Sequence, residues 1–141
     1  MNHDAINIAL HYLKFRPRTV FEMEKKLASK KIPEDEIRKT ISVFKKEKLL
    51  DDEKFATMWV EDRNHLKPTG SYLLKMELKR LGVAENIIEK ALAEQDEEEL
   101  ARQAIESKSR YRNADFPKQA GFLQRRGFGM GVIYKILNPK S

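Results

Sequence analysis

The sequence predicts an all-α protein, built as an elongated array of three tandem three-helix repeats with helix-turn-helix-like units. The first observation is residues 74–92, where apolar residues at three- and four-residue spacing flank Gly82. Glycine is expected to end the first of these two helices, because it adopts a positive φ without a Cβ penalty. The second observation is that this stretch recurs imperfectly at residues 23–41 and 119–137. The third is a charged fraction of 35%, which suits thin helices exposed to water.

The copies lie about 50 residues apart, since Leu78 corresponds to Leu27 in one copy and to Leu123 in the other. Repetition at this period is typical of helical arrays, in which each unit buries its apolar face with help from its neighbours. The predicted repeats are residues 1–50, 51–95 and 96–141.

Three helices are predicted in the first repeat: over about residues 4–14, over 19–30, and from 34 onward. Pro17 ends the first helix because it cannot donate to the helix ladder. Thr19 followed by Glu22 is a capping-box signal for the second helix. The third helix begins with three acidic residues, which the helix dipole favours, and is expected to turn Ile37, Ile41 and Phe44 inward.

The second repeat is expected to begin where Asp51 and Asp52 cap a helix. Phe55 and Trp59 share one face of that helix, and Trp59 is interpreted either as a core residue or as part of a contact surface. The polar residues 64–70 include proline and glycine and predict a loop before the stretch around Gly82.

After Leu92 the sequence allows two separate helices or one helix that bends near Gln95. Asp115 and Pro117 predict the start of a helix in the third repeat. The last helix is expected to end at residues 138–139. In total about nine helices and no strand are predicted.

Charge is unevenly distributed along the chain, whose formal net charge is +6. Residues 1–50 carry 12 lysines and arginines against 7 acids, residues 51–95 carry 7 against 9, and residues 96–141 carry 9 against 6. Two basic ends therefore flank an acidic middle. This pattern indicates contact with phosphates or with an acidic protein surface, and the alternative is lysine that is simply solvated on helix backs.

Several classes of protein are excluded or disfavoured. The chain has no cysteine, which rules out disulfides and thiolate catalysis. No apolar run approaches the ~18 residues that span a bilayer, and the N-terminus does not resemble a signal peptide, so a cytoplasmic protein without membrane contact is expected. The three histidines lack metal-ligand spacing. Residues 127–131 superficially resemble a glycine-rich phosphate loop, but they follow no predicted strand and Gly127 matches the turn position of Gly82.

We therefore predict no catalytic, metal-binding or cofactor-binding residues, and a monomer that acts by contact. Basic residues cluster in the first and third repeats, and Tyr111 lies among them, where it either stacks on bases or covers a helix end. The predicted contact residues are Arg16, Arg18, Lys25, Lys26, Lys30, Lys31, Arg63, Lys108, Arg110, Tyr111, Arg112, Lys118, Arg125 and Arg126.

Residues 49–56, LLDDEKFA, closely resemble the LDDERFA signature of the RecX family of bacterial regulators of the RecA recombinase. The segment RPRTVFEMEKKL, at residues 16–27, resembles that family's RPRSEAELRRKL block. ELKRLGV and the terminal FLQRRGF match its later blocks, so the resemblance extends over about residues 5–137. The chain departs from the family at Lys31 and Lys48, where glycine is usual, and these two turns are expected to be shaped differently.

The resemblance implies a non-enzymatic modulator, most simply an inhibitor, that binds RecA filaments on single-stranded DNA. It would restrain their ATPase, strand exchange and coprotease activity. Double-stranded DNA is a further candidate partner. The alternative functions are a stand-alone DNA-binding helical module, such as a transcriptional regulator, and a helical adaptor for another acidic protein. The helix-turn-helix pattern favours the DNA module, but three copies of it favour an array.

Overall fold

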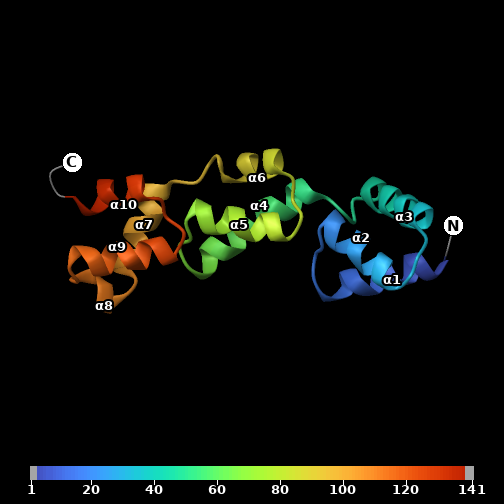
Figure 1. Cartoon of the computed structure of the whole chain (residues 1–141), viewed down its shortest axis with the longest axis horizontal. Helices are drawn as coiled ribbons and strands as arrows, with labels where there is room; N and C mark the ends of the chain where they lie inside the picture. The colour runs from blue at the N-terminus through green and yellow to red at the C-terminus, as the bar shows by residue number, and fades with distance from the viewer. Residues whose placement is uncertain (1–2, 139–141) are drawn as a thin grey trace.

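The computed structural model describes residues 3–138 as an all-helical chain, and no strand occurs in that range. The helices gather in three groups along one long axis, with the termini at opposite ends (Figure 1). The predicted all-α, elongated array is therefore confirmed. The helices are α1 (His3–Phe15), α2 (Val20–Ser29), α3 (Glu34–Lys46), α4 (Asp52–Leu66), α5 (Ser71–Arg80), α6 (Glu85–Leu92), α7 (Glu97–Glu106), α8 (Ser109–Arg112), α9 (Phe116–Arg125) and α10 (Met130–Leu137).

Two details of the predicted helices are wrong. The described residues form ten helices rather than nine, because the basic stretch after residue 107 adds the short α8. The predicted loop over residues 64–70 begins only after Leu66. Asn64 lies in the last turns of α4, and its side-chain oxygen accepts a hydrogen bond from the backbone N–H of Thr69 at 2.8 Å. Asn64 therefore lies in the helix, but its polar side chain stabilises the loop that follows.

Side-chain caps mark the starts of four helices, α2, α4, α7 and α9. Thr19 and Glu22 form a complete capping box at α2. Asp51, Asp96 and Asp115 each accept a hydrogen bond from the backbone N–H three residues later. Because Asp96 caps the start of α7, α6 and α7 are two separate helices. The alternative of one helix that bends near Gln95 is therefore excluded.

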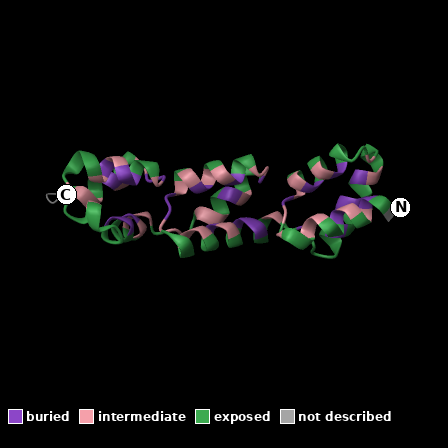
Figure 2. Cartoon of the chain, turned by 90° about the horizontal axis from the view of Figure 1, so that it is seen from below, coloured by how far each residue is buried: buried purple, intermediate pink, exposed green. Residues whose placement is uncertain are grey.

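Each group of helices encloses a buried apolar cluster of its own (Figure 2). The first cluster contains Ala5, Ala9, Met23, Leu27, Ile37, Ile41, Phe44 and Leu50. The second contains Phe55, Ala56, Val60, Leu74, Leu78, Val83 and Ile88, with Trp59 partly buried against it. The third contains Ala101, Ala104, Ile105, Ala120, Phe122, Leu123, Phe128 and Ile133. In every helix pair with extensive contact, both helices belong to the same group. The repeat boundaries at residues 50 and 95 stay a prediction.

Four turns between helices share one backbone geometry. Gly82 and Gly127 have φ of 82° and 92°, as expected for glycine, but Lys31 and Lys48 are also left-handed, with φ of 62° and 61°. The expectation that the two lysine turns differ in shape is therefore wrong. In each turn the N–H of the next residue donates to the carbonyl five residues back, for example from Val83 to Leu78 at 3.1 Å. These hydrogen bonds hold the backbone left-handed whichever residue occupies the turn.

We expect Lys31→Gly and Lys48→Gly each to raise the free energy of unfolding by about 0.5–1 kcal/mol. The left-handed backbone costs a lysine about 1–2 kcal/mol, and the greater freedom of glycine in the unfolded chain offsets part of the gain. Urea unfolding measures the change. Lys30→Gly is the control, because Lys30 has φ of −93° and gains nothing from glycine. A loss of stability in both lysine-turn variants would contradict this account.

At the first junction, the start of α2 docks on the turn between α5 and α6. The hydroxyl of Thr19 donates to the carbonyl of Leu81 at 2.6 Å. A Cβ added at Gly82 would collide with the side chain of Phe21, so only glycine permits this approach. The N–H of Val20 donates to the Oδ1 atom of Asp52 at 3.0 Å. Burial raises the pKa of that carboxyl above its ordinary value, against the lowering effect of the Val20 hydrogen bond.

The second junction repeats this arrangement one unit further along. The N–H of Gly70, which caps α5, donates to the carbonyl of Arg126 at 2.8 Å, and the N–H of Tyr72 donates to the carbonyl of Gly127 at 3.1 Å. A Cβ on Gly127 would collide with the side chain of Leu73. In both junctions, therefore, the start of a group's second helix packs against the glycine turn of the following group.

Candidate nucleic-acid and protein interface

A basic cavity of about 330 Å³ opens at the first junction. Lys25 and Lys26 reach it from α2, and Arg80 reaches it from the last turn of α5. The rings of Tyr12 and Phe21 also line it. The junction builds this site, because docking Thr19 on Leu81 brings the end of α5 beside α2.

Aromatic rings lie beside the two lysines of this cavity. The Nζ atom of Lys25 lies 5.2 Å from the ring centroid of Phe21, and that of Lys26 lies 5.3 Å from the centroid of Tyr12. The guanidinium carbon of Arg18 lies 3.7 Å from the same Tyr12 ring. Such contacts favour positive charge over the ring face. Cations beside exposed aromatic carbon suit a phosphate and the base attached to it.

Among the residues of this cavity that sequence reasoning missed are its arginine and its two aromatic residues, Arg80, Tyr12 and Phe21. Arg80 belongs to the acidic middle segment and is distant in sequence from Lys25, so only the junction brings the two together. A signal was present for Phe21, because the repeat offset that relates Leu27 to Leu78 also places an aromatic residue, Tyr72, at the matching position.

Three of the predicted contact arginines are engaged inside the array. Arg16 forms an ion pair with Glu22, the capping-box residue. Arg63 donates to both carboxylate oxygens of Glu77, at 3.0 and 2.7 Å. Arg126 donates to the carbonyl of Pro68 at the second junction. Burial lowers the pKa of Arg126 below its ordinary value, and the charge of Arg63 lowers it further. These contacts indicate that the three arginines stabilise the fold, rather than contact a partner.

Glu77→Gln is expected to lower the free energy of unfolding by about 2 kcal/mol, between the values for surface and buried ion pairs. Glu77 also accepts from the indole N–H of Trp59 at 3.0 Å, and the Arg63 and Glu77 side chains are only 29% and 21% exposed. The variant therefore leaves the Arg63 charge uncompensated. Fluorescence of Trp59, the single tryptophan, reports the unfolding.

The control for this measurement is Glu34→Gln. Its pair with Arg38 is 3.7 Å long and its two side chains are 86% and 71% exposed, so we expect a change of no more than about 0.5 kcal/mol. Equal effects of the two substitutions would contradict a supporting role for the Arg63–Glu77 pair.

A second basic cluster surrounds α8 in the third group. Its exposed members are Lys108, Arg110, Arg112, Lys118 and Arg125. The guanidinium carbon of Arg110 lies 5.3 Å from the ring centroid of Tyr111, and Arg125 donates to the Tyr111 hydroxyl at 3.3 Å. The ring of Tyr111 stacks on Phe122, with centroids 4.1 Å apart. One face of Tyr111 is thus used within the protein, which favours the helix-covering interpretation over base stacking.

Lys30 and Lys31 are exposed and follow the end of α2, but they do not line the basic cavity. The structure therefore divides the predicted contact residues. It gathers Lys25 and Lys26 at the first junction, a second set at α8, and leaves Lys30 and Lys31 apart. Contact by any of these residues stays a prediction.

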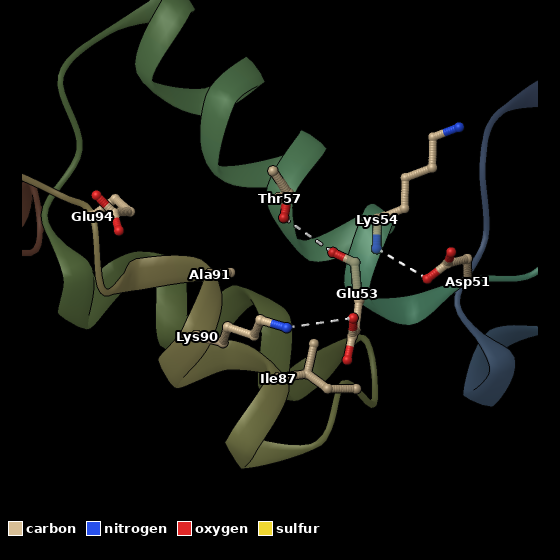
Figure 3. Close-up of a pocket in the computed structure, with 8 residues that line it drawn as sticks. All are labelled: Asp51, Glu53, Lys54, Thr57, Ile87, Lys90, Ala91 and Glu94. Carbon is tan, nitrogen blue, oxygen red and sulfur yellow. Dashed lines mark hydrogen bonds and ion pairs between the residues drawn. The ribbon is translucent and has the colours of Figure 1, made fainter.

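The middle group carries an acidic hollow of about 580 Å³ between α4 and α6 (Figure 3). Asp51 and Glu53 line it from the start of α4, and Glu94 lines it from beyond the end of α6. Lys90 turns toward Glu53, with its Nζ atom 3.8 Å from Oε2.

No helix among the described residues is long and apolar enough to cross a membrane.

Family models described as the first and second three-helix domains of RecX match residues 5–42 and 51–92. The regulatory protein RecX of Thermotoga maritima is 41% identical over 138 residues, which cover 94% of this chain and 82% of that protein. The regulatory protein RecX of Mycolicibacterium smegmatis is 30% identical over 146 residues, which cover 95% and 78%. The crystal structure of RecX from Lactobacillus salivarius has a TM-score of 0.85 at 27% identity and covers 95% of this chain and 92% of that one.

Proposed function

Because this chain belongs to the RecX family, we propose that it is a non-enzymatic cytoplasmic regulator of the RecA recombinase. In this proposal it acts as a monomer, binds RecA filaments on single-stranded DNA, and restrains ATP hydrolysis, strand exchange and coprotease activity. The family relationship supports a regulatory role, and the arrangement of charge on the array supports the way in which it would act.

The observation that carries the proposal is an elongated array with two separate basic surfaces along its length (Figure 1). The basic cavity lies at the first junction and the basic cluster lies at α8, with the acidic hollow of the middle group between them. An elongated protein with this spacing of charge can contact successive protomers of a filament and its DNA backbone at once, which strengthens binding through linked weak contacts.

ATP hydrolysis by RecA from the same source, on single-stranded DNA and with increasing amounts of this protein, tests the proposal. We expect hydrolysis to fall at substoichiometric amounts, since one array would act on several protomers. The protein without RecA is the control and is expected to hydrolyse no ATP. Unchanged RecA activity over the whole titration would refute the proposal.

A stand-alone DNA-binding module is the second candidate function, and the basic aromatic cavity favours it. This alternative predicts binding to DNA without RecA, a steep loss of affinity as salt rises, and a preference among sequences. Binding to naked DNA, with no effect on RecA, would select it over the filament regulator.

A further inference from the structure

The acidic hollow is the centre of a continuous groove along α4 and α6. Three cavities form the groove, with volumes of about 430, 580 and 480 Å³. The first and second share Asp51, Glu53 and Ile87, and the second and third share Thr57 and Ala91. Because neighbouring cavities share lining residues, one groove extends from the end of α3 to the start of α7.

The floor of the groove is apolar and accessible. Val60 lines it from α4, and Ile87 and Ala91 line it from α6. Leu100 of α7 completes the floor at the far end. Ile87, Ala91 and Leu100 are only partly buried, so an apolar side chain placed in the groove would remove further apolar surface from water.

The rim of the groove is acidic, although the whole chain is basic. Its carboxylates are Asp51, Glu53, Glu61, Glu94, Asp96 and Glu99. Four lysines also line the groove, namely Lys45, Lys48, Lys54 and Lys90. Lys90 pairs with Glu53 and Arg102 pairs with Glu99, while Lys54 extends away from Lys90 and Glu53 (Figure 3). The carboxylates of the groove still outnumber these cations. Among the described residues, Glu61 and Glu94 have no ion-pair partner and are exposed. A phosphate backbone would therefore be repelled here.

We propose that this groove binds a basic segment of a partner protein, with an apolar side chain on the floor and flanking arginines or lysines on the rim. Charge complementarity selects this occupant, and a groove between two packed helices suits a single extended or helical segment. The inference deepens the proposed function in one respect, because we take the segment to belong to RecA. The groove would then face protein, while the basic cavity and α8 face DNA.

The test compares two double charge reversals in the middle group, each with one residue on α4 and the other on α6 or just beyond its end. Glu61→Lys with Glu94→Lys changes the rim. Asp62→Lys with Glu89→Lys makes the same change in net charge at exposed residues that do not line the groove. Circular dichroism checks that both variants keep their helices, as we expect for substitutions at exposed residues. We expect affinity for RecA filaments on single-stranded DNA to fall about tenfold for the rim variant, with no such loss for the control.

A second readout separates this inference from the proposed function. A short fluorescein-labelled peptide of arginine and leucine is titrated against the three proteins, and a peptide with glutamate in place of arginine serves as its control. The rim variant is expected to bind the basic peptide about tenfold more weakly than the wild type and the control variant. This measurement needs no RecA, so it judges the groove even if the wild type fails to bind filaments.

The outcomes are distinct. A selective loss in the rim variant, with binding to naked single-stranded DNA kept or tightened, supports the groove. Equal losses in both variants, or no loss in either, overturn it, because the effect would then follow net charge or lie elsewhere. Absence of filament binding by the wild type refutes the proposed function alone, and the peptide titration then decides whether the groove takes a basic segment.

Discussion

Gly127→Ala is expected to lower the free energy of unfolding by about 2–4 kcal/mol and to loosen the third group from the middle one. A left-handed backbone costs alanine about 1–2 kcal/mol. The added Cβ would also collide with the side chain and backbone N of Leu73 and force the second junction open. The hydrogen bonds that Arg126 and Gly127 accept from α5 and its cap would be lost with it.

Two probes measure this effect. Circular dichroism follows all helices during urea unfolding, whereas Trp59 fluorescence follows the middle group. We expect the two transitions, coincident in the wild type, to separate in Gly127→Ala. Gly131→Ala is the matched control, since a Cβ there meets no atom within 4 Å and alanine favours a helix by about 0.5–1 kcal/mol over glycine. Coincident transitions in Gly127→Ala would show that the junction does not depend on this glycine.

Reversal of the three cations of the basic cavity is expected to weaken binding to single-stranded DNA about 100-fold or more. The variant is Lys25→Glu with Lys26→Glu and Arg80→Glu. Each cation that neutralises a phosphate releases counterions, so the slope of log K against log salt should also become shallower by about 2–3. Fluorescence anisotropy of a labelled oligothymidine at several salt concentrations measures both quantities.

The control carries the same change in net charge at exposed lysines that do not line the cavity, namely Lys39, Lys46 and Lys67. We expect it to retain most of its affinity, because the Debye length at physiological salt is about 8 Å and screens distant charge. Equal losses in the two triple variants would locate DNA binding in the overall charge of the chain rather than in the cavity.

Much of the local structure follows from short stretches of sequence. The capping box at Thr19 and the cap at Asp115 were readable because the bonded groups lie three residues apart. Gly82 and Gly127 were readable because a positive φ restricts the residue type. The two lysine turns were misread, because hydrogen bonds around the turn, rather than the side chain at its centre, fix the backbone there.

The candidate site was less predictable, since contacts between groups decide it. A list of basic residues does not separate Arg63, which an internal carboxylate engages, from Arg80, which reaches the cavity. Both lie in the acidic middle segment and differ only in their neighbours. The basic stretch at α8 was visible in the sequence, but the stacking of Tyr111 on Phe122 depends on how α8 folds back on α9.

The separate clusters and narrow junctions have a consequence for folding. Because extensive helix contacts stay within each group, most native contacts join residues close in sequence, and such topologies fold quickly. The free energy of unfolding is then the sum of a contribution from each group of helices and a contribution from each junction between neighbouring groups. The middle unit has two neighbours and each end unit has one. Native-state opening therefore begins at the ends, and the helices bearing the groove are the last to exchange their amide hydrogens with solvent.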